Sequence, residues 1–159
     1  MKILLPVDGS ADALHAVTVA LQWVQQGLRA EFVLVNVQDP ASLYEMVVTH
    51  DVERLAQLRA EAGADLLRPA EALLQAAGQS FESEVAGGSP AALLPELAEN
   101  YRCELVLMGA RGVGDPGATG LGSVAESMLQ YASMPVTVVR SPIEEPPATD
   151  EPATDDDHV

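Results

Sequence analysis

The segment from Gly109 to Ser123 combines glycine spacing and helix initiation in a way that suits phosphate binding. It follows an apolar run and precedes a stretch with helical character. Glycine lets backbone N–H groups approach a ligand closely, and the N-terminus of the following helix adds further N–H donors and the positive end of its dipole. The chemistry that this segment predicts is anion binding by backbone groups.

These residues need a scaffold, and the chain alternates short apolar runs with longer helical patterns. The apolar runs predict five strands, at residues 2–7, 31–37, 81–86, 104–108 and 135–140. Strict alternation of strand and helix predicts a parallel sheet with helices on both faces. We therefore expect an α/β fold, an open five-stranded, doubly wound, Rossmann-like sheet of order 3-2-1-4-5. One domain at residues 1–141 is expected to contain it.

The first two predicted helices carry local signals. Apolar residues recur from Leu14 to Leu28 at three- and four-residue spacing, so Asp12 and His15 are expected on the solvent side. Residues 51–77 favour a second helix, which Pro69 is expected to kink or divide.

The last two predicted helices carry initiation signals. Ser89 and Pro90 suit the N-cap and the first helical position. Ser123 and Glu126 have the spacing of a capping box, which predicts that a helix begins directly after the glycine-rich segment.

The expected strand order places the glycine-rich segment at a binding crevice. In such sheets, ligands lie beyond the carboxyl ends of the strands where the order reverses, here between the first and fourth strands. The first strand ends in Pro6, Val7 and Asp8, and the fourth ends in Met108 and Gly109. The two strand exits are therefore predicted to flank one crevice.

Charge and composition exclude several classes of function. The net charge is −16, seven acids but no Lys or Arg follow Ile143, and no basic stripe exists, so nucleic-acid binding is excluded as a primary function. No apolar run is long enough to cross a bilayer and no secretion signal is evident, so a cytoplasmic protein without membrane contact is expected. Cys103 is the single cysteine, which excludes an intramolecular disulfide. Residues 142–159 predict a disordered acidic tail.

The spacing Gly109-x2-Gly112-x9-Gly122-Ser123 resembles the nucleotide-binding signature of the universal stress protein family, in its ATP-binding branch. The likeness extends over roughly residues 1–140. It includes the first strand exit at Asp8 and the second at Val37.

The resemblance implies an ATP site without catalytic or metal-ligating side chains. Mg²⁺ is expected to accompany the triphosphate, because Arg111 alone cannot offset the phosphate charge. The implied contacts run from the base to the outer phosphates: Val37 through its backbone for adenine; Pro6, Val7 and Asp8 for base and ribose; Met108, Gly109 and Gly112 for ribose and first phosphates; Gly122, Ser123 and Val124 for the outer phosphates.

The resemblance also implies a homodimeric regulatory protein of the stress response. ATP occupancy would alter the order of the loop and the choice of a regulatory protein partner, with at most slow hydrolysis. Two copies would pair through the edge strand from Pro135 to Arg140, which otherwise leaves an apolar ladder exposed.

The chain departs from the family pattern between Gly112 and Gly122, where Asp115 and additional glycines stand in place of basic or larger apolar residues. A carboxylate repels phosphate, and additional glycines raise the cost of ordering the loop. Two alternatives therefore stay open. One is a dimeric scaffold that binds no nucleotide; the other is a phosphohydrolase or nucleotidyl transferase in the same crevice, for which the sequence offers no phosphate-directed lysine and no evident general base.

Overall fold

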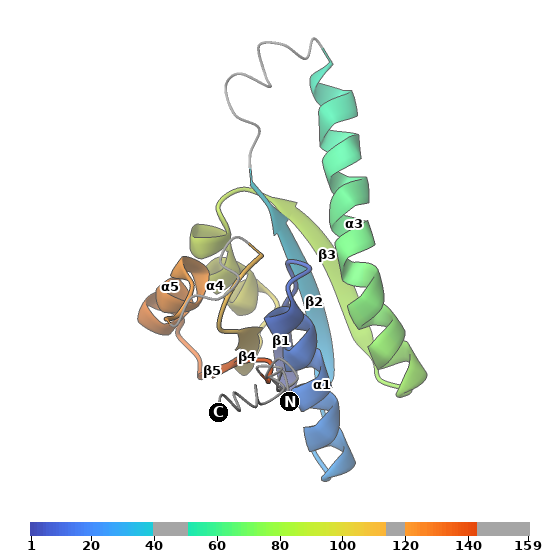
Figure 1. Cartoon of the computed structure of the whole chain (residues 1–159), viewed down its shortest axis with the longest axis vertical. Helices are drawn as coiled ribbons and strands as arrows, with labels where there is room; N and C mark the ends of the chain where they lie inside the picture. The colour runs from blue at the N-terminus through green and yellow to red at the C-terminus, as the bar shows by residue number, and fades with distance from the viewer. Residues whose placement is uncertain (40–50, 114–119, 143–159) are drawn as a thin grey trace, which may run out of the picture.

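The computed structural model describes residues 1–39, 51–113 and 120–142. Five parallel strands form one sheet in the order β3-β2-β1-β4-β5 (Figure 1). The strands are β1 (Lys2–Pro6), β2 (Glu31–Gln38), β3 (Phe81–Gly87), β4 (Leu105–Gly109) and β5 (Val136–Val139). The helices of the described ranges are α1 (Ala11–Gln25), α3 (Val52–Ala76), α4 (Pro90–Asn100) and α5 (Ser123–Tyr131). The α/β class and the predicted strand order are both confirmed.

Helices cover both faces of the sheet, as the side chains of the central strand β1 require. Ile3 and Leu5 are fully buried in a cluster with side chains of α1 and α3. Leu4 is fully buried in a second cluster, on the opposite face, with side chains of α4 and α5. Successive strand residues point to opposite faces, so a continuous apolar run must be covered twice. Each such leucine contributes about 1.5 to 3 kcal/mol by its burial.

Helix α1 begins as its sequence indicates but exposes different residues. Ser10 is the N-cap, and its hydroxyl accepts a hydrogen bond from the backbone N–H of Ala13 at 3.2 Å. The prediction that Asp12 faces solvent is wrong: this side chain is buried, for a reason given below. Leu28 lies beyond the helix, after Gly27, whose φ of +108° is a conformation that other residues rarely adopt.

Helix α3 is one continuous helix, so of the two predicted effects of Pro69, a kink or a division, the division does not occur. The residues that it buries against the sheet include Gly63, Leu67 and Leu74. A Cβ atom at Gly63 would lie 2.4 Å from Val85 Cγ1 and 2.9 Å from Asn36 Oδ1. The helix therefore approaches β2 and β3 as closely as a glycine allows.

The starts of α4 and α5 lie where predicted, but their caps differ from the prediction. Ser89 is the N-cap of α4 and Pro90 follows it, yet the Ser89 side chain makes no capping hydrogen bond. The N-cap of α5 is Gly122, so Ser123 is the first helical residue and the predicted capping box does not form. The hydroxyl of Ser123 is consequently not used to cap the helix.

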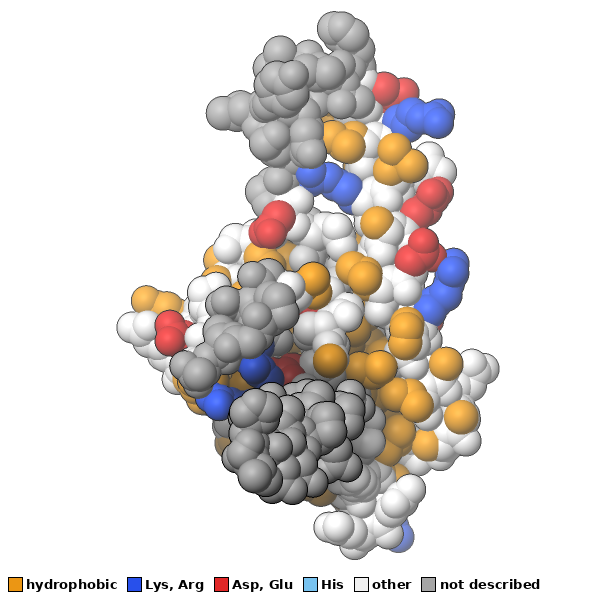
Figure 2. Space-filling view, in the orientation of Figure 1, with side chains coloured by type: hydrophobic (Ala, Val, Ile, Leu, Met, Phe, Trp, Pro, Cys, Tyr) orange, Lys and Arg blue, Asp and Glu red, His pale blue; other side chains and the backbone are white. Residues whose placement is uncertain are grey.

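The surface of α3 mixes charged and apolar side chains. Figure 2 shows hydrophobic side chains between acidic and basic ones along this helix, and Val52, Leu58 and Leu66 are exposed on it. Among the helices of the described ranges, none has the length and apolarity needed to span a membrane. The predicted acidic tail lies outside the described residues, apart from Pro142.

Candidate functional site

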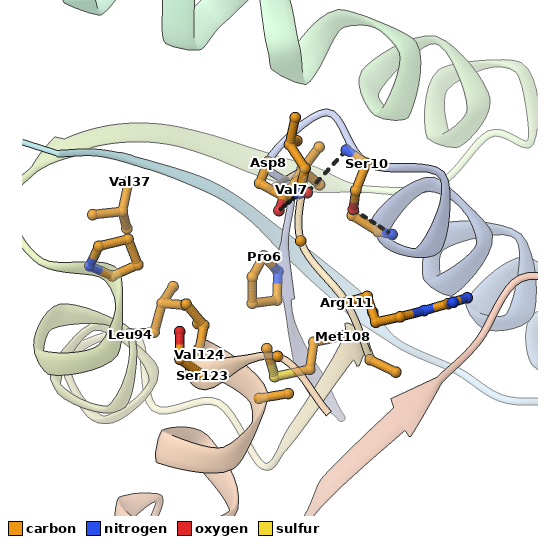
Figure 3. Close-up of a pocket in the computed structure, with 18 of the residues that line it drawn as sticks. Pro6, Val7, Asp8, Ser10, Val37, Leu94, Met108, Arg111, Ser123 and Val124 are labelled. Atoms are coloured by element: carbon orange, nitrogen blue, oxygen red, sulfur yellow. Dashed lines mark hydrogen bonds between the residues drawn. The ribbon is translucent and has the colours of Figure 1, made fainter. Parts of the chain in front are cut away.

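A cavity of about 500 Å³ opens at the carboxyl ends of β1, β2 and β4, where the strand order reverses (Figure 3). The structure brings together in this cavity all of the residues that were predicted to bind a nucleotide. They are Pro6, Val7, Asp8, Val37, Met108, Gly109, Arg111, Gly112, Gly122, Ser123 and Val124. Their role in binding stays a prediction, but their convergence from four separate parts of the chain is a property of the fold.

Further residues that the sequence did not single out complete the lining. They are Ser10, Ala13, Val35, Asp39, Pro90, Leu94, Ala110, Val113 and Ala125. The first turns of α1, α4 and α5 all reach the cavity, so three helix starts face it. No local signal in the sequence identifies these residues, because they reach the cavity only through the packing of helices on the sheet.

One end of the cavity is apolar. Val37, Leu94 and Val124 lie on one side of it in Figure 3, with Ser123 beside Val124, and Pro6 and Met108 lie between them and Arg111. An apolar surface suits a ring system, and the polar groups that line the rest of the cavity would fix its orientation.

Asp8 joins the exit of β1 to the glycine-rich loop. Its Oδ1 accepts a hydrogen bond from the backbone N–H of Ser10 at 2.9 Å, and its Oδ2 accepts one from Val113 N at 3.3 Å. A Cβ atom at Gly112 would lie 2.9 Å from the same Oδ2. The carboxylate thus holds the turn before α1 and the start of the loop at the same time.

The two ends of the glycine-rich loop meet through backbone contacts. Gly122 N donates to Ala110 O at 2.7 Å, and a Cβ at Gly122 would lie 3.3 Å from that oxygen. A Cβ at Gly109 would lie 2.7 Å from the backbone N of Ala13 and 2.7 Å from the carbonyl carbon of Asp12. Close backbone packing therefore requires glycine at position 109 and leaves little room for a side chain at position 122, before any ligand is considered.

Asp12 is a buried residue beside the site that sequence reasoning missed. Its Oδ2 accepts hydrogen bonds from the backbone N–H and the Nε of Arg111, both at 3.2 Å, and its Oδ1 accepts the N–H of Ser141 at 2.9 Å and the Ser141 hydroxyl. Burial raises the pKa of Asp12, but the hydrogen bonds from Ser141 and Arg111 outweigh it and lower the pKa from 3.8 to about 2. The carboxylate is therefore ionised throughout the physiological range.

Asn36 is a second buried polar residue near the cavity. Its Nδ2 donates to Val7 O at 2.8 Å, and its Oδ1 accepts from Gln38 Nε2 at 2.6 Å. This side chain ties the exit of β1 to β2, because the Val7 carbonyl lies just past the end of β1. Its position inside an apolar run, Phe-Val-Leu-Val-Asn-Val, was the one signal in the sequence that could have found it.

The described residues contain no group of three or more His, Cys, Asp or Glu side chains that could hold a metal ion. Cys103, which is buried and has its pKa raised by that burial, does not line the cavity.

The fold and this cavity define a doubly wound α/β protein with a ligand site at its topological switch point. The sequence model of the universal stress protein family matches residues 1–140, and the chain belongs to this family. It is 30% identical over 144 residues to universal stress protein MJ0531 of Methanocaldococcus jannaschii, a match that covers 91% of this chain and 84% of that protein. It is 31% identical over 144 residues to a universal stress protein of Thermus aquaticus, covering 87% and 97% of the two chains.

Solved structures share the same fold. The hypothetical protein MJ0577, whose structure was used to assign its biochemical function, superimposes with a TM-score of 0.74 at 25% identity, over 89% of this chain and 96% of the other. A universal stress protein in complex with cAMP gives a TM-score of 0.65 at 24% identity, covering 87% and 96%. An Arabidopsis thaliana family member with AMP bound gives 0.64 at 17% identity, covering 94% and 97%. At identities below 25%, these last two similarities show the fold alone.

Proposed function

We propose that this protein is an ATP-binding regulatory protein of the stress response, which acts as a homodimeric, nucleotide-dependent switch. The observation that carries the proposal is the convergence, on one cavity of about 500 Å³, of all the residues that the family signature implies for nucleotide binding. Cavities of roughly 300 to 1,000 Å³ are typical of small-molecule and cofactor sites. Family membership supports the link to stress.

The complexes of two relatives with cAMP and AMP are consistent with an adenine nucleotide as the ligand. Because those relatives are distant, the proposal for this chain depends on its own cavity. Adenine is proposed to lie at the apolar end, against the backbone of Val37, with Pro6 and Asp8 along base and ribose. The phosphates are proposed to extend towards Gly112 and Ser123, with Mg²⁺ carried on them.

The proposal includes at most slow ATP hydrolysis. Turnover slower than about one per minute is expected, whereas dedicated enzymes commonly run near ten per second. Faster, magnesium-dependent turnover by the purified protein would favour a phosphohydrolase instead.

Calorimetric titration with ATP and Mg²⁺ tests binding, and the start of α5 offers a matched pair of variants. Ser123→Asp places a carboxylate at a cavity-lining position on the first turn of α5, where an acid also suits the helix dipole. We expect it to weaken binding by about fivefold or more, since a like charge within about 4 Å of a phosphate costs roughly 1 kcal/mol or more. Gln130→Glu adds the same charge at an exposed site of α5 and is expected to leave affinity unchanged.

A dimeric scaffold without nucleotide is the second candidate function. It is favoured by Asp8, whose carboxylate accepts the N–H of Val113 and adds negative charge beside Gly112, towards which the phosphates are proposed to extend. Mass spectrometry of the natively purified protein separates the two functions. Co-purified adenine nucleotide supports the first, whereas apo protein without heat of binding at millimolar ATP supports the scaffold.

The homodimer is proposed to form through β5, which is an edge strand of the sheet. Leu129 and Tyr131 of the preceding α5 are exposed, at 50% and 65%, so apolar surface lies close to that edge in sequence. The carbonyl groups of Pro135 and Val139 accept hydrogen bonds from β4 and its exit, so Val138, which alternates with them, directs its N–H to the open edge.

Val138→Pro is therefore a specific test of this edge. It removes an edge N–H while leaving those hydrogen bonds to β4 in place. Light scattering at micromolar concentration is expected to give a dimer for the natural protein and a monomer for Val138→Pro, with unchanged circular dichroism. A monomeric natural protein would overturn the dimer.

A further inference from the structure

The charges around the cavity are arranged unfavourably for a chain of phosphates. Two carboxylates, Asp8 and Asp39, line the cavity, and the one basic side chain among the described lining residues is Arg111. Its Nε lies 3.2 Å from Asp12 Oδ2, and both side chains are largely shielded from water, at 18% and 5% exposure. In Figure 3 the Arg111 side chain extends away from Val37, Leu94 and Val124, towards α1.

Some backbone donors of the glycine-rich loop are also in use. Four N–H groups of its described residues donate to acceptors within the protein. The pairs are Ala110 to Val139 O, Arg111 to Asp12, Val113 to Asp8, and Gly122 to Ala110 O. A triphosphate could use these four N–H groups only if it broke the hydrogen bonds that they already make.

Asp8 opposes phosphate where the loop would contact it. Its Oδ2 is the atom that a Cβ at Gly112 would meet at 2.9 Å, and it holds the N–H of Val113. A phosphate near Gly112 would have to displace the carboxylate from that N–H or tolerate it at short range. Each further phosphate adds negative charge to a region in which the guanidinium of Arg111 is already paired.

We propose that Asp8 and Asp12 set the specificity of this cavity by phosphate charge: without a divalent cation, affinity falls from adenosine to AMP and falls further from AMP to ATP, and a divalent cation on the phosphates removes this order. Asp8 supplies the repulsion, and Asp12 fixes the guanidinium that would otherwise offset it. This inference rests on the proposed function, since it requires an adenine ligand in the cavity. It assigns the discrimination between ligands with different numbers of phosphates to two side chains of this protein. The glycine spacing alone does not predict that discrimination.

The test is a series of dissociation constants for adenosine, AMP, ADP and ATP, measured by calorimetry in EDTA and again with excess Mg²⁺. In EDTA, we expect ATP to bind at least about fivefold more weakly than AMP, the effect of roughly one like-charge contact in a water-like medium. With Mg²⁺ the difference is expected to disappear or reverse. Tighter binding of ATP than of AMP in EDTA would overturn the inference while leaving the proposed function intact.

Two variants of equal charge change separate the effect of Asp8 from that of the protein's overall charge. Asp8→Asn is expected to remove most of the difference between AMP and ATP in EDTA. Asp65→Asn removes an exposed carboxylate of α3, which pairs with Arg68, and is expected to leave the difference unchanged. Equal effects of the two would assign the discrimination to net charge and overturn the role of Asp8.

Asp12→Asn tests the second half of the inference. Without the carboxylate, the guanidinium of Arg111 is expected to strengthen ATP binding in EDTA more than AMP binding. Equal changes for both ligands in a folded variant would overturn the role of Asp12. If Asp12→Asn does not fold, the ligand series and the Asp8 pair still decide the specificity itself. Failure of adenosine and AMP to bind in any buffer would instead overturn the proposed function, and this inference with it.

Discussion

The carboxylate of Asp12 accepts hydrogen bonds from both the backbone N–H and the hydroxyl of Ser141, 129 positions later in the chain. Through Arg111 it also holds the exit of β4, 99 positions away. One side chain therefore fastens the start of α1 to the exits of two adjacent strands, beside the cavity. A buried charge that satisfies so many donors is costly to remove, because its partners would lose their acceptor away from water.

Asp12→Asn is expected to lower stability at neutral pH and to change how stability depends on pH. The pKa of Asp12 is lowered from 3.8 to about 2 by folding, so the stabilisation is complete above about pH 4 and is lost as the pH falls towards 2. At 1.4 kcal/mol per unit of pKa, its size is about 2 kcal/mol. Urea unfolding at pH 7, 4 and 2.5 measures it.

The gap in unfolding free energy between natural protein and Asp12→Asn is expected to narrow by about 1 kcal/mol between pH 4 and 2.5, and the remainder is lost as the pH falls through 2. Asp65→Asn, at a carboxylate that is 60% exposed, is the control and is expected to change stability little. A gap that stays constant with pH would show that Asp12 acts through packing and not through its charge.

The sheet and the place of the cavity could be predicted from the sequence, whereas the polar contacts around the cavity could not. Strand runs, their alternation with helices and the spacing from Gly109 to Ser123 are local patterns, and strand order follows from connection rules. Asp12 has the helical phase of a solvent-facing residue, and its partners Arg111 and Ser141 are distant in sequence. Asp12 is buried because of tertiary packing, which the helical spacing of apolar residues in the sequence does not predict.

The cap of α5 illustrates a different limit. Ser123 and Glu126 have capping-box spacing, yet Gly122 takes the N-cap with φ −70° and ψ 158°. The position of Gly122 is set by its hydrogen bond to Ala110 O, which closes the loop. A tertiary contact therefore gives the N-cap role to Gly122 in place of Ser123, and leaves the Ser123 hydroxyl at the cavity.

Gly109→Ala is expected to destabilise the fold by about 1 to 3 kcal/mol, the usual cost of overpacking. The added methyl would lie 2.7 Å from backbone atoms of Asp12 and Ala13, which cannot move without shifting the start of α1. Gly87→Ala is the matched control, since nothing lies within 4 Å of its Cβ position. Thermal unfolding of the two variants measures the difference, and equal melting temperatures would contradict the close packing of α1 on β4.

Tyr101 is expected to ionise at unusually high pH. Its hydroxyl donates a hydrogen bond to Glu84 Oε2, and this bond, together with burial and the Glu84 charge, raises the pKa of Tyr101 from 10.0 to about 12. Because folding raises the pKa, this contribution to stability is complete below pH 10 and is lost as the pH rises through 12. The difference in tyrosinate absorbance between natural protein and Tyr101→Phe isolates this phenol.

Glu84→Gln is expected to lower the pKa of Tyr101 towards 10, since it removes the charge at the acceptor. Glu82→Gln removes a more weakly coupled carboxylate on the same strand and is expected to have a smaller effect. A difference signal with a midpoint near pH 10 in the natural protein would contradict the contact between α4 and β3 at Glu84.

Gly63→Ala is expected to destabilise the protein at the far side of the sheet from α4 and α5. The methyl would lie 2.4 Å from Val85 Cγ1 and 2.9 Å from Asn36 Oδ1, so it would press on the side chain that holds the Val7 carbonyl. The expected loss is about 1 to 3 kcal/mol by urea unfolding.

Gly63→Ala combined with Val85→Ala should recover part of that loss, because the shorter side chain removes the nearest contact. If the double variant loses as much unfolding free energy as the two single variants together, the strain lies at Asn36 and not at Val85. It would then lie at the exit of β1, where the cavity begins.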